Sequence, residues 1–140
     1  MVAIELDTPV ARLVVVSLPL ELYREALQLL AHCSGFVQLT RDAAEVTLII
    51  DEIEWAKWAA DFPGARASTG WRLIRFDLTL DFTVVGFMAE VTRLMAGEGI
   101  SLLAISSWRT DGLLVGENHF DRAVTILRGA KHLAALAGTE

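Results

Sequence analysis

Residues 80–127 read LDFTVVGFMAEVTRLMAGEGISLLAISSWRTDGLLVGENHFDRAVTIL. Apolar residues recur every three or four positions over 84–95, which is the period of one buried helix face. The β-rich runs 100–108 and 112–117 flank a short polar turn, and a capped helix is expected over 118–127. This stretch therefore predicts the order loop, helix, strand, strand, helix.

The first half of the chain predicts the same order of elements. A valine-rich strand at 12–17 precedes an amphipathic helix at 20–30, and a hairpin at 36–51 precedes a short helix to residue 60. An alternating strand at 71–80 then begins the second half. The pattern β-α-β-β-α thus occurs twice, offset by about 60 residues.

Two such patterns predict an α+β protein of two ferredoxin-like units. We expect units at 1–65 and 71–137, with antiparallel sheets, helices on one face and a linker at 66–70. Each half lacks its own last strand, so we expect the units to exchange terminal strands. Either the strand at 71–80 serves both units, or the alternating run at 2–6 completes the second unit.

The charge and hydropathy of the chain disfavour nucleic acids and membranes as partners. The chain has 12 Lys and Arg against 18 Asp and Glu. Nucleic-acid binding needs clustered basic residues, so we expect no nucleic-acid partner and no membrane partner. No apolar run reaches the roughly 20 residues of a membrane span, and the first residues lack a basic signal region. The single Cys33 excludes an intramolecular disulfide, and we expect a cytoplasmic protein.

The hydrophobic content indicates a further buried surface. Hydrophobic residues make up 54% of the chain, and the mean hydropathy is +0.46. These values are high for a soluble monomer, so we expect a homodimer. A sheet with few long loops would account for the same composition.

The second half also carries an ordered set of short motifs. They are a tryptophan before the first strand, a first loop with Asp-Phe and Gly, a Gly-Ile-Ser strand entry, and a serine-rich strand end with a Thr-Asp turn. The residues are Trp71; Asp81, Phe82 and Gly86; Gly99, Ile100 and Ser101; Ile105, Ser106, Ser107, Thr110 and Asp111. In this order they resemble the ACT domain, and within it the small bacterial tandem-ACT proteins related to CASTOR-type arginine sensors. Trp108 stands where a tyrosine is more usual, and Gly112 where an aromatic residue is common, so ligand identity does not carry over.

The resemblance implies two tandem ACT units of βαββαβ order that bind an amino acid where two ACT units meet. A ligand carboxylate would suit the unpaired N–H groups at a helix N-terminus, and an aspartate or strand-edge carbonyls would take the ammonium. The candidate ligand-binding residues are Asp81, Phe82, Thr83, Val84, Val85, Gly86, Ser106, Ser107, Thr110 and Asp111.

Each candidate also has a purely structural interpretation. Asp81 and Thr83 are good helix N-caps, and Gly86 would allow close packing. Asp111 begins an Asp-Gly hairpin-turn signal, and the serines before it would simply face solvent at a strand end. Trp108 would fill an interface rather than a pocket.

Signals for catalysis are absent from the sequence. It contains no G-x-S-x-G, phosphate loop or H-E-x-x-H motif. His32 and Cys33 are adjacent on a helix, point about 100° apart and cannot close a metal site alone. We therefore expect no enzyme, cofactor or metal ion. The sequence favours a regulatory protein that binds an amino acid and signals to an unknown protein partner; the alternative is an oligomerisation or interaction module without a ligand.

Overall fold

The computed structural model describes residues 3–138, which form two compact units. The N-terminal unit consists of residues 11–71, and the C-terminal unit consists of the described residues up to 10 and from 72 onward. These boundaries differ from the expected 1–65 and 71–137, because the first ten residues belong to the unit that contains the second half of the sequence.

The N-terminal unit packs two helices on a sheet of order β3-β4-β2-β5. Its apolar residues alternate along β2 and β4, so that Val14, Val16, Leu48 and Ile50 are buried in one cluster with helix residues such as Leu29. The elements are β2 (Arg12–Leu18), η1 (Leu20–Leu22), α1 (Tyr23–His32), β3 (Val37–Arg41), β4 (Val46–Asp51), α2 (Glu52–Trp58), η2 (Ala59–Asp61) and the first part of β5 (Arg66–Phe76).

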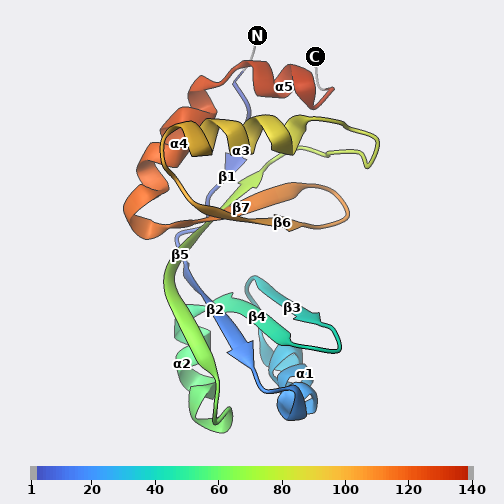
Figure 1. Cartoon of the computed structure of the whole chain (residues 1–140), viewed down its shortest axis with the longest axis vertical. Coiled ribbons are helices and arrows are strands. Elements are labelled where there is room, and N and C mark those ends of the chain that lie inside the picture. The colour runs from blue at the N-terminus through green and yellow to red at the C-terminus, as the bar shows by residue number, and fades with distance from the viewer. Residues whose placement is uncertain (1–2, 139–140) are drawn as a thin grey trace. The chain divides into compact units, whose positions relative to one another are not determined.

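The C-terminal unit packs three helices on a sheet of order β1-β5-β7-β6 (Figure 1). Ile74 and Phe76 of β5 are buried with Val91 of α3, Leu127 of α4 and Leu133 of α5, so the helices cover one face of the sheet. The elements are β1 (Leu6–Asp7), the last part of β5, α3 (Phe87–Gly97), β6 (Leu102–Ser106), β7 (Asp111–Gly116), η3 (Glu117–His119), α4 (Phe120–Gly129) and α5 (His132–Leu136).

Strand β5 contributes to both units, which changes the expected linker. Residues 66–70 are the first part of β5 and not a linker. The run ARASTGW includes the β-branched Thr69 and the aromatic Trp71, and sheet pairing overrides the loop signal of its serine and glycine. Gly70 lies within β5 and has a φ of +79°, a backbone conformation that favours glycine.

The first strand of the chain pairs with β5 of the C-terminal unit. Leu6 lies opposite Phe76, and Asp7 lies opposite Arg75, in antiparallel register. The strand is shorter than the expected run at 2–6, of which Val2 lies outside the described residues and residues 3–5 have no strand assignment. The pairs β2–β4, β3–β4 and β6–β7 are also antiparallel.

Helix starts differ from the sequence expectations at two places. The helix expected from residue 84 begins at Phe87, because Gly86 is its N-cap at a φ of +90°. The expected cap at Asn118 is wrong: α4 has His119 at its N-cap position and no side-chain cap bond. Helix α2 does have a side-chain cap, since Asp51 accepts hydrogen bonds from the N–H groups of Ile53 and Glu54. No helix among residues 3–138 is long and apolar enough to cross a membrane.

Candidate functional site

A hollow of about 310 Å³ opens in the C-terminal unit beside the start of α3. Its walls come from the loop between β5 and α3, the first turn of α3, the end of β6 and the first residue of β7. That volume is near the lower end of the roughly 300–1,000 Å³ that is usual for small-molecule sites. The lining residues are Leu80, Asp81, Phe82, Val84, Gly86, Phe87, Met88, Ala89, Ser106, Ser107 and Asp111.

Asp81 organises the first wall of the hollow. Its Oδ1 accepts hydrogen bonds from the backbone N–H of Thr83 at 2.9 Å and from the Thr83 hydroxyl at 2.7 Å. Both bonds lower the pKa of the Asp81 carboxyl below its usual value, and the bond from the backbone N–H has the larger effect. Asp81 is therefore a carboxylate at neutral pH, and it caps this local turn rather than helix α3.

The N-terminus of α3 forms the second wall. Gly86 is the N-cap and has no side chain to accept from the first N–H groups of the helix. The next three residues, Phe87, Met88 and Ala89, all line the hollow. A helix start without a side-chain cap presents backbone donors and a partial positive charge, which suit a carboxylate.

Gly86 is explained by its backbone angle and not by packing. An added Cβ at Gly86 would meet nothing within 4 Å, so neither close packing nor a neighbouring strand requires the glycine. Its φ of +90° does, because L-residues with a side chain rarely adopt that conformation.

The end of the β6–β7 hairpin forms the third wall. The Ser106 hydroxyl donates to Asp111 Oδ1 at 2.7 Å, and this bond orients the carboxylate, which lines the hollow. The backbone N–H and the hydroxyl of Ser107 both donate to the carbonyl of Thr110, at 2.9 and 3.2 Å. The backbone N–H of Leu80 donates to the Arg109 carbonyl, so the loop and the hairpin are joined directly.

Thr110 is placed differently from the other candidates. It is 8% exposed, and its hydroxyl donates to the Phe76 carbonyl at 2.8 Å. It does not line the hollow of about 310 Å³. Its side chain instead ties the hairpin turn to β5, which supports a structural role.

We expect Thr110→Val to lower the free energy of unfolding by about 1 kcal/mol, the net contribution of one hydrogen bond. The cost stays at this level because the Phe76 carbonyl also accepts from the backbone N–H of Leu78. Urea unfolding followed by circular dichroism measures it. Thr125→Val is the control, because its hydroxyl donates only within α4 to the Asp121 carbonyl on the surface, and it should change stability by less than about 0.5 kcal/mol. Equal losses in the two variants would contradict the role of Thr110.

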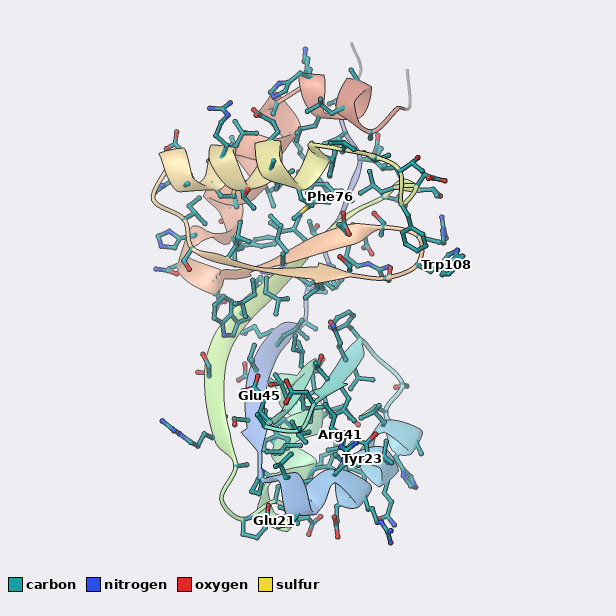
Figure 2. All side chains as sticks on the ribbon, turned by 45° about the vertical axis from the view of Figure 1, so that its right-hand side comes forward. Glu21, Tyr23, Arg41, Glu45, Phe76 and Trp108 are labelled. Carbon is teal, nitrogen blue, oxygen red and sulfur yellow. The ribbon has the colours of Figure 1, made fainter. Side chains whose placement is uncertain are left out.

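An exposed aromatic pair stands beside the hollow. Phe82 and Trp108 are 71% and 81% exposed, and their rings meet edge to face with centroids 5.0 Å apart. Figure 2 shows Trp108 on the outside of the unit, in contrast to the buried Phe76. Val85, on the same loop as Phe82, is 87% exposed. Thr83, Val85 and Trp108 are not among the lining residues.

Most of the candidate residues from the sequence lie together around the hollow, although contact with a ligand stays a prediction. Seven line it: Asp81, Phe82, Val84, Gly86, Ser106, Ser107 and Asp111. Sequence reasoning missed Leu80, Phe87, Met88 and Ala89. The glycine at position 86 was the available signal for the last three, because glycine is among the residues found at helix N-caps and an amphipathic run follows it.

The charge of the lining decides which chemistry it can perform. Asp81 and Asp111 are its only ionisable residues, and no basic side chain is among the lining. The helix start therefore provides the positive potential and the aspartates provide the negative one. Within residues 3–138 no group of three or more His, Cys, Asp or Glu side chains could hold a metal ion.

Comparisons with known proteins show that other proteins share the fold of this chain. Residues 66–129, just under half of the chain, match the model of the ACT domain family. A crystal structure of a protein from Agobacterium tumefaciens has 21% identity and a TM-score of 0.69, covering 94% of this chain and 91% of that one. No curated protein sequence shows a significant match.

Two further structures share the fold. A Vibrio cholerae protein of unknown function, described as a possible transport protein, has 17% identity and a TM-score of 0.69, covering 91% of this chain and 89% of that one. The regulatory subunit of aspartate kinase from Thermus thermophilus has 9% identity and a TM-score of 0.66, covering 91% and 98%. The chain thus contains an ACT domain match within an ACT-like α+β fold, and ACT domains are commonly regulatory domains that bind small molecules.

Proposed function

We propose that this chain is a non-catalytic regulatory protein of two tandem ACT units that binds a free amino acid at the hollow beside α3. One observation carries the proposal: the uncapped start of α3 and the carboxylates of Asp81 and Asp111 line the same hollow. An amino acid presents a carboxylate and an ammonium a short distance apart. The helix start suits the first group and the aspartates suit the second.

Asp81 is poorly suited to general acid–base catalysis. Such a role at neutral pH needs a carboxyl whose pKa is raised, whereas the pKa of Asp81 is lowered by its bonds from Thr83. A permanently ionised carboxylate instead favours steady attraction of an ammonium group. Occupancy would then be passed to a protein partner, and we propose a homodimer as the working assembly.

A thermal-shift screen with each of the 20 amino acids tests the function. Binding only to the folded state contributes RT ln(1 + [L]/Kd), which is about 2.7 kcal/mol at a hundredfold excess over Kd. For a chain of this size that corresponds to a rise in Tm of roughly 5–10 °C. Asp111→Asn should weaken the binding of the active amino acid at least tenfold. Asp61→Asn is the matched control, since Asp61 is an exposed aspartate of the N-terminal unit outside the hollow.

No shift with any amino acid at millimolar concentration would reject the amino-acid function. Equal binding by wild type and Asp111→Asn would reject the hollow as its site. The two failures are therefore distinct.

A second function is favoured by one observation, the exposed apolar trio Phe82, Val85 and Trp108. Such exposed apolar residues are typical of a protein interface. In an oligomerisation or interaction module without a ligand, Trp108→Ser would dissociate the assembly in sedimentation experiments while no amino acid shifts the Tm.

A further inference from the structure

A second hollow, of about 180 Å³, lies in the C-terminal unit on residues that the proposed function does not use. It is bounded by β1, the end of β5 and the turn of the β6–β7 hairpin. Four of its lining residues are charged. The lining residues are Asp7, Arg75, Phe76, Asp77, Leu78, Arg109 and Thr110.

The strand register places these charges away from the helices. Ile74 and Phe76 are buried in the core that the helices cover, so Arg75 between them faces the opposite side of the sheet. Asp7 lies directly opposite Arg75 on the paired strand β1, and therefore shares that side. Arg109 joins them from the hairpin turn.

The four charged side chains do not neutralise one another. Among residues 3–138, Asp7, Arg75, Asp77 and Arg109 form no salt bridge within 4.0 Å and no side-chain hydrogen bond. Cross-strand neighbours of opposite charge commonly pair, but Asp7 and Arg75 form no ion pair although they are partners in the strand register. The stem of Arg75 runs along Gly112 of β7, where an added Cβ would lie 3.3 Å from its Cγ.

We propose that this second hollow is a binding site for a small carboxylate that also carries a hydrogen-bond donor, an ammonium or a hydroxyl group. Guanidinium groups recognise carboxylates through paired N–H donors, and both arginines here keep that capacity. The aspartates accept from the ligand's ammonium or hydroxyl. Two positive and two negative side chains line the site, so it favours a ligand without a large net charge.

The two hollows use different residues of the same hairpin turn. Thr110 lines the second hollow, whereas Ser107 and Asp111 line the first. No residue lines both hollows, so each can be disabled by its own variant. The second site does not depend on whether the first binds an amino acid.

The test is a titration of the ¹⁵N-labelled full-length protein, monitored by two-dimensional NMR at fixed ionic strength. The probes are glycine, glycolate, acetate and ethylammonium chloride. We expect glycine or glycolate, or both, to shift the amides of residues 75–78 and 109–110 in a saturable way at millimolar concentration. Acetate should bind at least fivefold more weakly, and ethylammonium should leave these amides unchanged. The ratio of the dissociation constants of glycine and glycolate shows whether the site prefers the ammonium or the hydroxyl as donor.

Variants assign the binding to the two arginines. Arg75→Gln and Arg109→Gln should each weaken the saturable binding at least tenfold, and Arg109 is exposed, so its variant should keep the fold. Arg128→Gln, an exposed arginine of α4 outside the hollow, should bind like wild type. Asp111→Asn should also retain this binding, which separates it from the amino-acid site. Unsaturable shifts, equal shifts with all four probes, or full binding by both arginine variants would overturn the proposal.

Discussion

Phe76→Ala is expected to lower the free energy of unfolding of the C-terminal unit by about 3–5 kcal/mol, the usual cost of removing a buried phenylalanine ring. Phe76 has no exposed surface and packs edge to face on Phe87, with ring centroids 4.8 Å apart. The substitution removes apolar contacts from the centre of the core and leaves a cavity that the strands cannot fill. Urea unfolding followed by circular dichroism should show a lower midpoint with an unchanged dependence on urea concentration.

The chain offers a matched control in Phe82→Ala. Phe82 is a phenylalanine of the same unit, but it is 71% exposed, so its removal should cost less than about 1 kcal/mol. The loss at Phe76 should also reach the candidate site, because Phe87 begins α3 and lines the hollow. A loss of under about 1.5 kcal/mol at Phe76 would contradict the assignment of this residue to the core.

The order of helices and strands was predictable because the spacing of hydrophobic residues along the sequence differs between a helix and a strand. The stripe of Val91 and Met95 in α3, and the alternation of Ile74 and Phe76 in β5, each bury the face that the spacing predicts. The ends of elements were less predictable. Residues 66–70 have turn-forming composition, yet they complete a sheet, because the neighbouring strand β2 offers backbone partners that no local pattern reveals.

For the candidate ligand-binding site, the sequence predicted which segments lie close together, but not which individual side chains line the hollow. The resemblance pointed to the loop at 81–86 and to the hairpin end, and both segments line one hollow. It also included Thr110, whose hydroxyl is used within the fold, because a motif records residue identity and not the direction of a side chain. The second hollow carried no sequence signal, since Asp7 and Arg109 are far apart in the chain and meet only through strand pairing and a turn.

Gly112→Ala is expected to lower the free energy of unfolding by about 1–3 kcal/mol, the usual cost of overpacking. An added Cβ would lie 2.9 Å from the Ile74 carbonyl oxygen, which belongs to the backbone of the neighbouring strand and cannot turn aside. The same unfolding experiment measures the loss. Gly97→Ala is the matched control: it ends α3, an added Cβ would meet nothing within 4 Å, and alanine should stabilise the helix by up to about 1 kcal/mol.

The close approach of β7 to β5 accounts for the glycine at position 112. A larger side chain would collide with the backbone of β5. Because Asp111 precedes Gly112 and Arg75 runs along it, forcing the strands apart should disturb both hollows at once. We therefore expect Gly112→Ala to weaken amino-acid binding and small-carboxylate binding together, whereas Asp111→Asn and Arg75→Gln each weaken one. If Gly112→Ala lost binding at only one of the two hollows, the contact between β5 and β7 at Gly112 would not support both of them.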